Sequence, residues 1–179
     1  EEDYEKSKIA GKSIKVDVRE DYFKDLLNRV PIKKNFRVVV DGSAATAGAI
    51  VPEILRRAGC EVVEYNCKVD SSFPLGVADP TSSKVIGRLS KEVLESKADI
   101  GFNYDADGDR IGIVDEKGNI IWNDVLVAIF AKDVLSDHPG ATIMYNILCS
   151  KTVKETITQF GGQPFMWRVG HSFLKKKNH

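Results

Sequence analysis

Strand-like and helix-like segments alternate along most of this chain, and this alternation limits its fold more than any other feature. From residue 36 onward, short apolar runs are followed by turns and then by segments with apolar residues at helical spacing. Such alternation is typical of α/β proteins, in which helices cover a largely parallel sheet. The pattern predicts strands at 36–40, 60–65, 100–104, 111–115 and 120–121, and helices at 46–58 and 82–97.

The segment before residue 36 has weaker patterns. Ile14, Val16 and Val18 alternate with polar residues, which predicts a strand. The apolar residues between 22 and 30 have the spacing of an amphipathic helix. Asp41-Gly42-Ser43 follows the first strand of the repeating region, and we interpret it as a structural cap of the next helix.

A second unit begins near Trp122. Its predicted elements are helices at 123–136 and 150–160, strands at 142–147 and 164–169, and a helix opening at 170–172. Two strands and little more than two helices cannot cover both faces of a parallel sheet. We therefore predict an α/β fold of two consecutive units with mixed, mainly parallel sheets, residues 1–121 and 122–179, the second one truncated.

Composition narrows the classes of protein to consider. The chain has 42% apolar and 29% charged residues, which is ordinary for a soluble globular protein. Its zero net charge argues against a broad nucleic-acid surface. The apolar runs are too short to span a bilayer, and the N-terminus lacks a signal-peptide pattern. We predict a cytoplasmic protein without nucleic-acid or membrane partners, in which the cysteines (Cys60, Cys67 and Cys149) pack as small hydrophobes.

The segment Asp105-Ala106-Asp107-Gly108-Asp109-Arg110 carries the strongest chemical signal. Alternate side chains of an extended backbone point the same way, so the three carboxylates can converge once Gly108 lets the loop turn. Such hard oxygen ligands favour Mg2+ or Ca2+. Arg110 cannot coordinate a cation, but its planar guanidinium suits a phosphate. The segment, called the acidic loop below, predicts a metal site beside an anion site.

A solvated acidic turn without function is the simplest alternative. From Asp99 to Asp124 there are seven acidic residues against only Arg110 and Lys117. Close carboxylates repel one another by about 1 kcal/mol per pair in a solvent-rich loop. An acidic loop without a counterion is therefore unfavourable, and the charge excess favours a bound cation.

Three other kinds of site also use clustered carboxylates. An EF-hand requires glycine where this chain has Arg110, and helices where strands are predicted on both sides. A Mg2+-dependent phosphatase with Asp105 as nucleophile remains an alternative, although its usual motif has threonine at the position of Asp109. A non-catalytic divalent-cation-binding module also remains open.

The order of motifs along the chain resembles the middle of an α-D-phosphohexomutase, the phosphomannomutase/phosphoglucomutase family. The resemblance covers nearly all 179 residues. It rests on Asp41-Gly42-Ser43-Ala44, Phe73-Pro74, Asp79-Pro80, the acidic loop, and Val169-Gly170-His171. It implies the whole second domain and about the first half of the third domain of a four-domain isomerase of carbohydrate metabolism.

The resemblance also implies roles for individual residues. Asp105, Asp107 and Asp109 would bind Mg2+, and Arg110 would contact the phosphorylated sugar and the transferring group. Gly170 and His171 would contact the sugar, a hexose 1-phosphate or 6-phosphate of mannose or glucose. The reaction would be an intramolecular phosphoryl transfer through a phosphoserine.

The chain departs from the family pattern in ways that affect activity. None of its serines is followed by His-Asn-Pro, the sequence expected around the phosphoserine. A phosphate-binding loop of the fourth domain is absent as well, and Leu148 stands where related bacterial enzymes often have a basic residue. We therefore expect a fragment that is inactive alone and that needs the missing first and fourth domains of the same polypeptide as partners.

Overall fold

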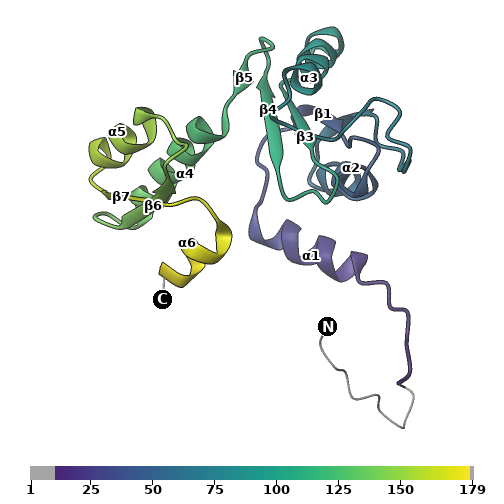
Figure 1. Cartoon of the computed structure of the whole chain (residues 1–179). Helices are drawn as coiled ribbons and strands as arrows, with labels where there is room; N and C mark the ends of the chain where they lie inside the picture. Colours follow the sequence, from purple (N-terminus) through teal and green to yellow (C-terminus); the bar gives the residue numbers. More distant parts are fainter. Residues whose placement is uncertain (1–10, 178–179) are drawn as a thin grey trace.

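A computed structural model describes residues 11–177, which form two α/β units in series (Figure 1). The first unit has a five-stranded sheet of order β2-β1-β3-β4-β5, and the second has a two-stranded sheet of β6 and β7. The first unit comprises α1 (Arg19–Arg29), β1 (Arg37–Asp41), the 3-10 helix η1 (Thr46–Ala49), α2 (Val51–Arg57), β2 (Glu61–Tyr65), α3 (Ser83–Ser96), β3 (Ile100–Tyr104), β4 (Ile111–Asp115) and β5 (Ile120–Ile121). The second comprises α4 (Asn123–Asp137), β6 (Thr142–Asn146), α5 (Lys151–Gln159), β7 (Gln163–Trp167) and α6 (His171–Lys177).

The strand pairings confirm the predicted fold class. β1 pairs in parallel with β2 and β3, whereas β4 pairs antiparallel with β3 and β5. β6 and β7 are parallel. The chain thus has two consecutive α/β units with mixed, mainly parallel sheets, and the second unit is short.

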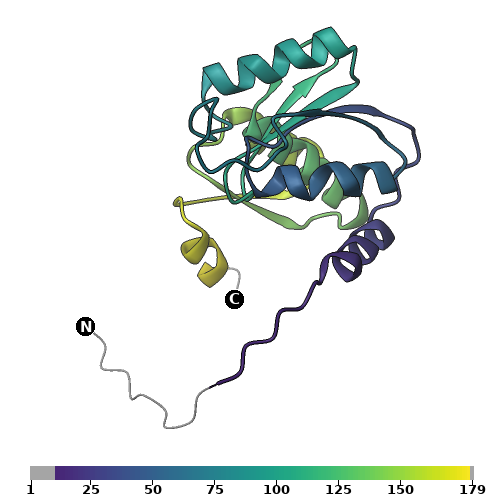
Figure 2. The same cartoon turned by 90° about the vertical axis from the view of Figure 1, so that its right-hand side faces the viewer.

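Strand β1 lies inside the first sheet, between β2 and β3, and its valines are buried on both faces. Val39 packs with Ile86 and Leu89 of α3 on one face. Val38 and Val40 pack on the other face, where α2 contributes Val51 and Leu55. Figure 2 shows α3 and α2 on opposite sides of the sheet. Burial on both faces explains why β1 is a continuous apolar run rather than an alternating one.

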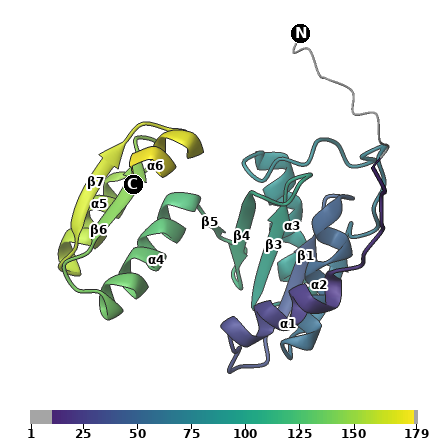
Figure 3. The same cartoon turned by 90° about the horizontal axis from the view of Figure 1, so that it is seen from below.

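The second unit has its core on one face of its sheet. The buried residues of α4, α5 and β6 form one cluster there: Ala131, Leu135, Tyr145, Val153 and Ile157. On the other side, Lys177 of α6 lies over the rings of Phe165 and Trp167. Figure 3 shows how β5 leads from the first sheet directly into α4. No helix among residues 11–177 is long and apolar enough to cross a membrane.

The predicted strand over Ile14, Val16 and Val18 is wrong. These side chains are exposed, and residues 11–18 form no regular structure. A strand needs a partner, and the first sheet ends at β2 on one side and β5 on the other. The predicted amphipathic helix is present as α1, which buries only Phe23.

Arg57 is the main polar link between α1 and α2. Its guanidinium makes two hydrogen bonds to Glu20 of α1, of 2.7 and 2.9 Å, and lies 4.8 Å from the ring centroid of Phe23. The variant Arg57→Gln is expected to speed amide hydrogen exchange throughout α1, while the melting temperature of the sheet unit stays unchanged. Arg29→Gln, which breaks a pair within α1, is the matched control. Equal exchange in both variants would contradict this account of the link.

Candidate functional site

The acidic loop connects the carboxyl end of β3 to β4, beside the carboxyl end of β1. Asp41 and Asn103, the last paired residues of β1 and β3, lie next to each other in the sheet. The carboxyl ends of parallel strands are the usual place for ligands in open α/β sheets. The loop is flanked by strands on both sides, as predicted, which excludes the helix-flanked EF-hand geometry.

The three loop carboxylates converge. One oxygen from each of Asp105, Asp107 and Asp109 lies within 4.8 Å of the other two. Magnesium holds oxygen ligands at about 2.1 Å, so two of its ligands are at most about 4.2 Å apart. A closure of a few tenths of an ångström would let the three oxygens share one ion. The donor set therefore fits a hard divalent cation, although the role of these residues as metal ligands stays a prediction.

The charges of the loop act on one another. The charge of Asp107 is the largest cause raising the pKa of Asp109, followed by burial and the charge of Asp105. Burial also acts to raise the pKa of Asp105, but hydrogen bonds from the backbone and guanidinium of Arg110 outweigh it, so this pKa lies below its ordinary value. The loop thus concentrates negative charge that a cation would neutralise.

Arg110 has three acidic residues around it, of which Asp109 is the most distant, with its Oδ1 3.9 Å from Nε. Its Nε lies 2.7 Å from Oδ2 of Asp105, and its backbone N–H donates to Oδ1 of the same residue over 3.1 Å. One terminal nitrogen lies 3.6 Å from Oδ1 of Asp79. The side chain is nevertheless 55% exposed, so it can still meet a phosphate. The sequence shows Asp79 only as part of an Asp-Pro motif, and its position beside Arg110 is visible only in the structure.

A buried polar layer lies next to the acidic loop at the ends of β1 and β3. Asp41 accepts a hydrogen bond from the backbone N–H of Ser43, and the side-chain amide of Asn103 donates to the Ser43 hydroxyl. Burial is the largest cause raising the pKa of Asp41. The predicted helix-cap role of this segment is wrong: helical structure begins at Thr46, after Ala45, without a side-chain cap. A polar residue inside an otherwise apolar strand, as Asn103 is, was the signal for this layer.

Gly170 and His171 belong to the second unit and are not joined to the acidic loop by any hydrogen bond or ion pair found within residues 11–177. Gly170 has a φ of 125°, which favours glycine, and its carbonyl accepts hydrogen bonds from the first turn of α6. His171 is exposed at the start of that helix. Their contact with a sugar stays a prediction.

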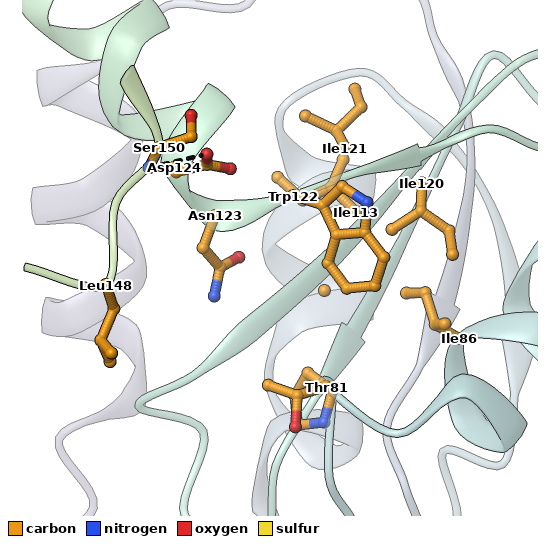
Figure 4. Close-up of a pocket in the computed structure, with 12 residues that line it drawn as sticks. Thr81, Ile86, Ile113, Ile120, Ile121, Trp122, Asn123, Asp124, Leu148 and Ser150 are labelled. Atoms are coloured by element: carbon orange, nitrogen blue, oxygen red, sulfur yellow. Dashed lines mark hydrogen bonds between the residues drawn. The ribbon is translucent and has the colours of Figure 1, made fainter. Parts of the chain in front are cut away.

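A pocket of about 380 Å³ lies where the two units meet. Figure 4 shows Thr81 and Ile120 of the first unit, and Leu148 and Ser150 of the second unit, among the residues that line it. Hydrogen bonding from Ser150 is the largest cause lowering the pKa of Asp124, which also lines the pocket. Pro80 and Thr81, which line the pocket, come directly after Asp79 in the sequence, and Asp79 lies beside Arg110. The pocket therefore begins close to the phosphate-binding candidate.

The fold and this loop define an α/β protein with a candidate cation and phosphate site at the carboxyl edge of its sheet. Residues 20–118 match the model of the phosphoglucomutase/phosphomannomutase α/β/α domain II, and residues 122–179 match that of domain III. The chain therefore belongs to the phosphoglucomutase/phosphomannomutase family, as its resemblance to phosphohexomutases indicated.

Individual relatives agree with the family assignment. The chain is 40% identical over 93% of its length to a phosphomannomutase/phosphoglucomutase of Pseudomonas putida, and 39% identical to that of Pseudomonas aeruginosa. It spans 36% of the length of both relatives. A crystal structure of a family protein from Burkholderia thailandensis superposes with a TM-score of 0.86 and 34% identity, over 90% of this chain and 35% of that one.

Proposed function

We propose that this chain provides the cation-binding and sugar-contact parts of a Mg2+-dependent phosphohexomutase, an isomerase that interconverts hexose 1-phosphate and hexose 6-phosphate. The observation that carries the proposal is the convergence of Asp105, Asp107 and Asp109 beside Arg110, in a chain of this family. Mannose and glucose phosphates are the proposed substrates because the relatives are named for both sugars.

Each residue of the site has a proposed task. The three aspartates would hold Mg2+, which when bound supplies positive charge that stabilises a transferring phosphoryl group. Arg110 would bind a phosphate oxygen through the part of its guanidinium that faces solvent. Asp105 and Asp79 would fix the direction of Arg110, because both carboxylates lie beside its nitrogen atoms. Positioning of this kind accounts for much of the catalysis in phosphoryl transfer.

The phosphoryl carrier is proposed to be a serine outside these 179 residues. No serine here is followed by His-Asn-Pro, and the matched relatives are nearly three times as long as the aligned region. The remaining domains of such a polypeptide would be the partners of this chain. Gly170 and His171 would contact the sugar from the second unit, with the boundary between the units at residues 121 and 122.

The phosphatase alternative is less well supported. Both oxygens of Asp105 accept hydrogen bonds from Arg110, and its side chain is only 3% exposed. A nucleophile needs an accessible oxygen with available electron density, and a charged hydrogen-bond donor reduces both. The Asp105 carboxylate is therefore better suited to hold Arg110 and a cation than to attack phosphorus.

A turnover assay tests directly whether the phosphoserine lies outside this chain. The 179-residue chain with Mg2+ is expected to show no interconversion of mannose 1-phosphate and mannose 6-phosphate, because no phosphoserine is present to donate the phosphoryl group. It is also expected to release no phosphate above the level of an Asp105→Asn variant. Enzyme-like interconversion by the chain alone would overturn the proposal, and phosphate release lost in Asp105→Asn would favour the phosphatase.

A further inference from the structure

The segment between β1 and α2 forms hydrogen bonds with the chain on both sides of Asp105, the first carboxylate of the acidic loop. The Thr46 hydroxyl donates a hydrogen bond of 2.9 Å to the carbonyl oxygen of Ala106, the residue after Asp105. The Asn103 side chain, two residues before Asp105, donates to the Ser43 hydroxyl over 2.9 Å. Two hydrogen bonds across 60 residues of sequence therefore bracket Asp105. We call this pair of contacts the loop brace.

Residues 43–48, which form these hydrogen bonds, are themselves fixed by backbone contacts. Ser43 and Ala44 have φ values of 51° and 55°, in the left-handed region, and hydrogen bonds fix both. The Ser43 N–H donates to Asp41, and the Ala44 N–H donates to the carbonyl of Asn66 over 2.7 Å. A Cβ added at Gly48, two residues after Thr46, would lie 2.4 Å from the carbonyl oxygen of Cys67. The segment can therefore act as a rigid anchor.

The loop needs an anchor because its charges oppose its folded shape. One carboxylate oxygen of Asp107 lies within 4.8 Å of one of Asp109, both side chains are exposed, and like charges so close repel each other. Without a restraint, the loop would open and separate these carboxylates, and a cation would have to bring them back together. Restraining a loop in its binding shape reduces that cost and raises affinity.

We propose that Thr46 is a positioning residue for the cation site, acting through the carbonyl of Ala106. Its hydroxyl holds the backbone between Asp105 and Asp107, so that the carboxylates remain convergent before the cation arrives. Ser43 and Asn103 hold the other side of Asp105. This inference rests on the proposed function of the acidic loop as a cation site, and it assigns to Thr46 no contact with the cation or the sugar.

Mn2+ titration of the 179-residue chain, followed by the electron paramagnetic resonance of free Mn2+, tests the proposal. Thr46→Val removes the donor at nearly constant volume, and Thr46→Ser keeps it. Thr46→Val is expected to bind Mn2+ roughly three- to tenfold more weakly than wild type, the loss typical of one hydrogen bond. Thr46→Ser is expected to restore affinity. Thr158→Val, at an exposed threonine of α5, should bind like wild type.

Amide hydrogen exchange without metal provides a second measurement. Exchange in residues 105–110 is expected to be faster in Thr46→Val than in wild type or Thr46→Ser, with equal melting temperatures. Equal exchange in all three chains, or equal Mn2+ affinity, would overturn the role of Thr46. If Asp107→Asn bound Mn2+ with the affinity of wild type, the cation site itself would be overturned. Failure of the Thr46 proposal and failure of the proposed cation site are therefore distinguishable.

Discussion

The double variant Asp107→Asn/Asp109→Asn is expected to lose divalent-cation binding and to keep its fold. Both side chains are exposed and offer oxygens to the convergent set, whereas Asp105 is buried and holds Arg110. Removing two of three charged ligands should weaken Mg2+ and Mn2+ binding by about 100-fold or more. Calorimetric titration with Mn2+, followed by displacement with Mg2+, measures this loss.

The same variant should not be less stable when metal is absent. The charge of Asp107 raises the pKa of Asp109, so in the folded chain these two carboxylates repel each other. Replacing both by asparagine removes the repulsion, and the melting temperature in EDTA is expected to stay equal or to rise. Asp133→Asn/Asp137→Asn, in exposed positions of α4, removes the same charge and should bind the cation like wild type. A metal-free chain that melts well below wild type would indicate that the loop carboxylates stabilise the fold rather than bind an ion.

Gly48→Ala is expected to be the most destabilising small substitution in the first unit. The new Cβ would lie 2.4 Å from the carbonyl oxygen and 2.7 Å from the Cα of Cys67. Both are backbone atoms, so neither can move aside without displacing the segment after β2. Overpacking of this kind costs about 3 kcal/mol, which corresponds to a melting temperature lower by about 6–12 °C for a chain of this size.

Gly87→Ala is the matched control for this effect. Gly87 lies in the exposed face of α3, and a Cβ there would meet no atom within 4 Å. Alanine inside a helix is more favourable than glycine by about 0.5–1 kcal/mol. Differential scanning calorimetry should therefore find opposite changes in the two variants. Equal melting temperatures for Gly48→Ala and wild type would contradict the close approach of the two backbone segments.

The repeating α/β architecture could be predicted because local signals and burial agree. Most of the helices and strands after residue 36 occur near their predicted ranges, and many of their apolar residues belong to a buried cluster. The strand over Ile14 to Val18 was wrong for the opposite reason: alternation of apolar residues cannot make a strand where no partner strand lies beside it. The sequence pattern reports a preference of the backbone, and pairing depends on tertiary structure.

In the candidate site, too, the local features could be predicted from the sequence and the long-range contacts could not. The convergence of the loop carboxylates could be expected from their alternate spacing, which is a local property. The contacts of Thr46 with Ala106 and of Asn103 with Ser43 join residues 60 positions apart, and no local pattern indicates such pairs. Asp79 beside Arg110 is a further contact of this kind.

A chimera tests most directly whether these residues form part of a phosphohexomutase active site. Residues 11–177 would replace the matching segment of the Pseudomonas putida relative, and formation of glucose 6-phosphate from glucose 1-phosphate would be followed in a coupled assay. The chimera is expected to be active with Mg2+, and Asp107→Asn/Asp109→Asn within it is expected to lower kcat by about 100-fold or more. A folded chimera that is inactive, or an equally active double variant, would contradict the account.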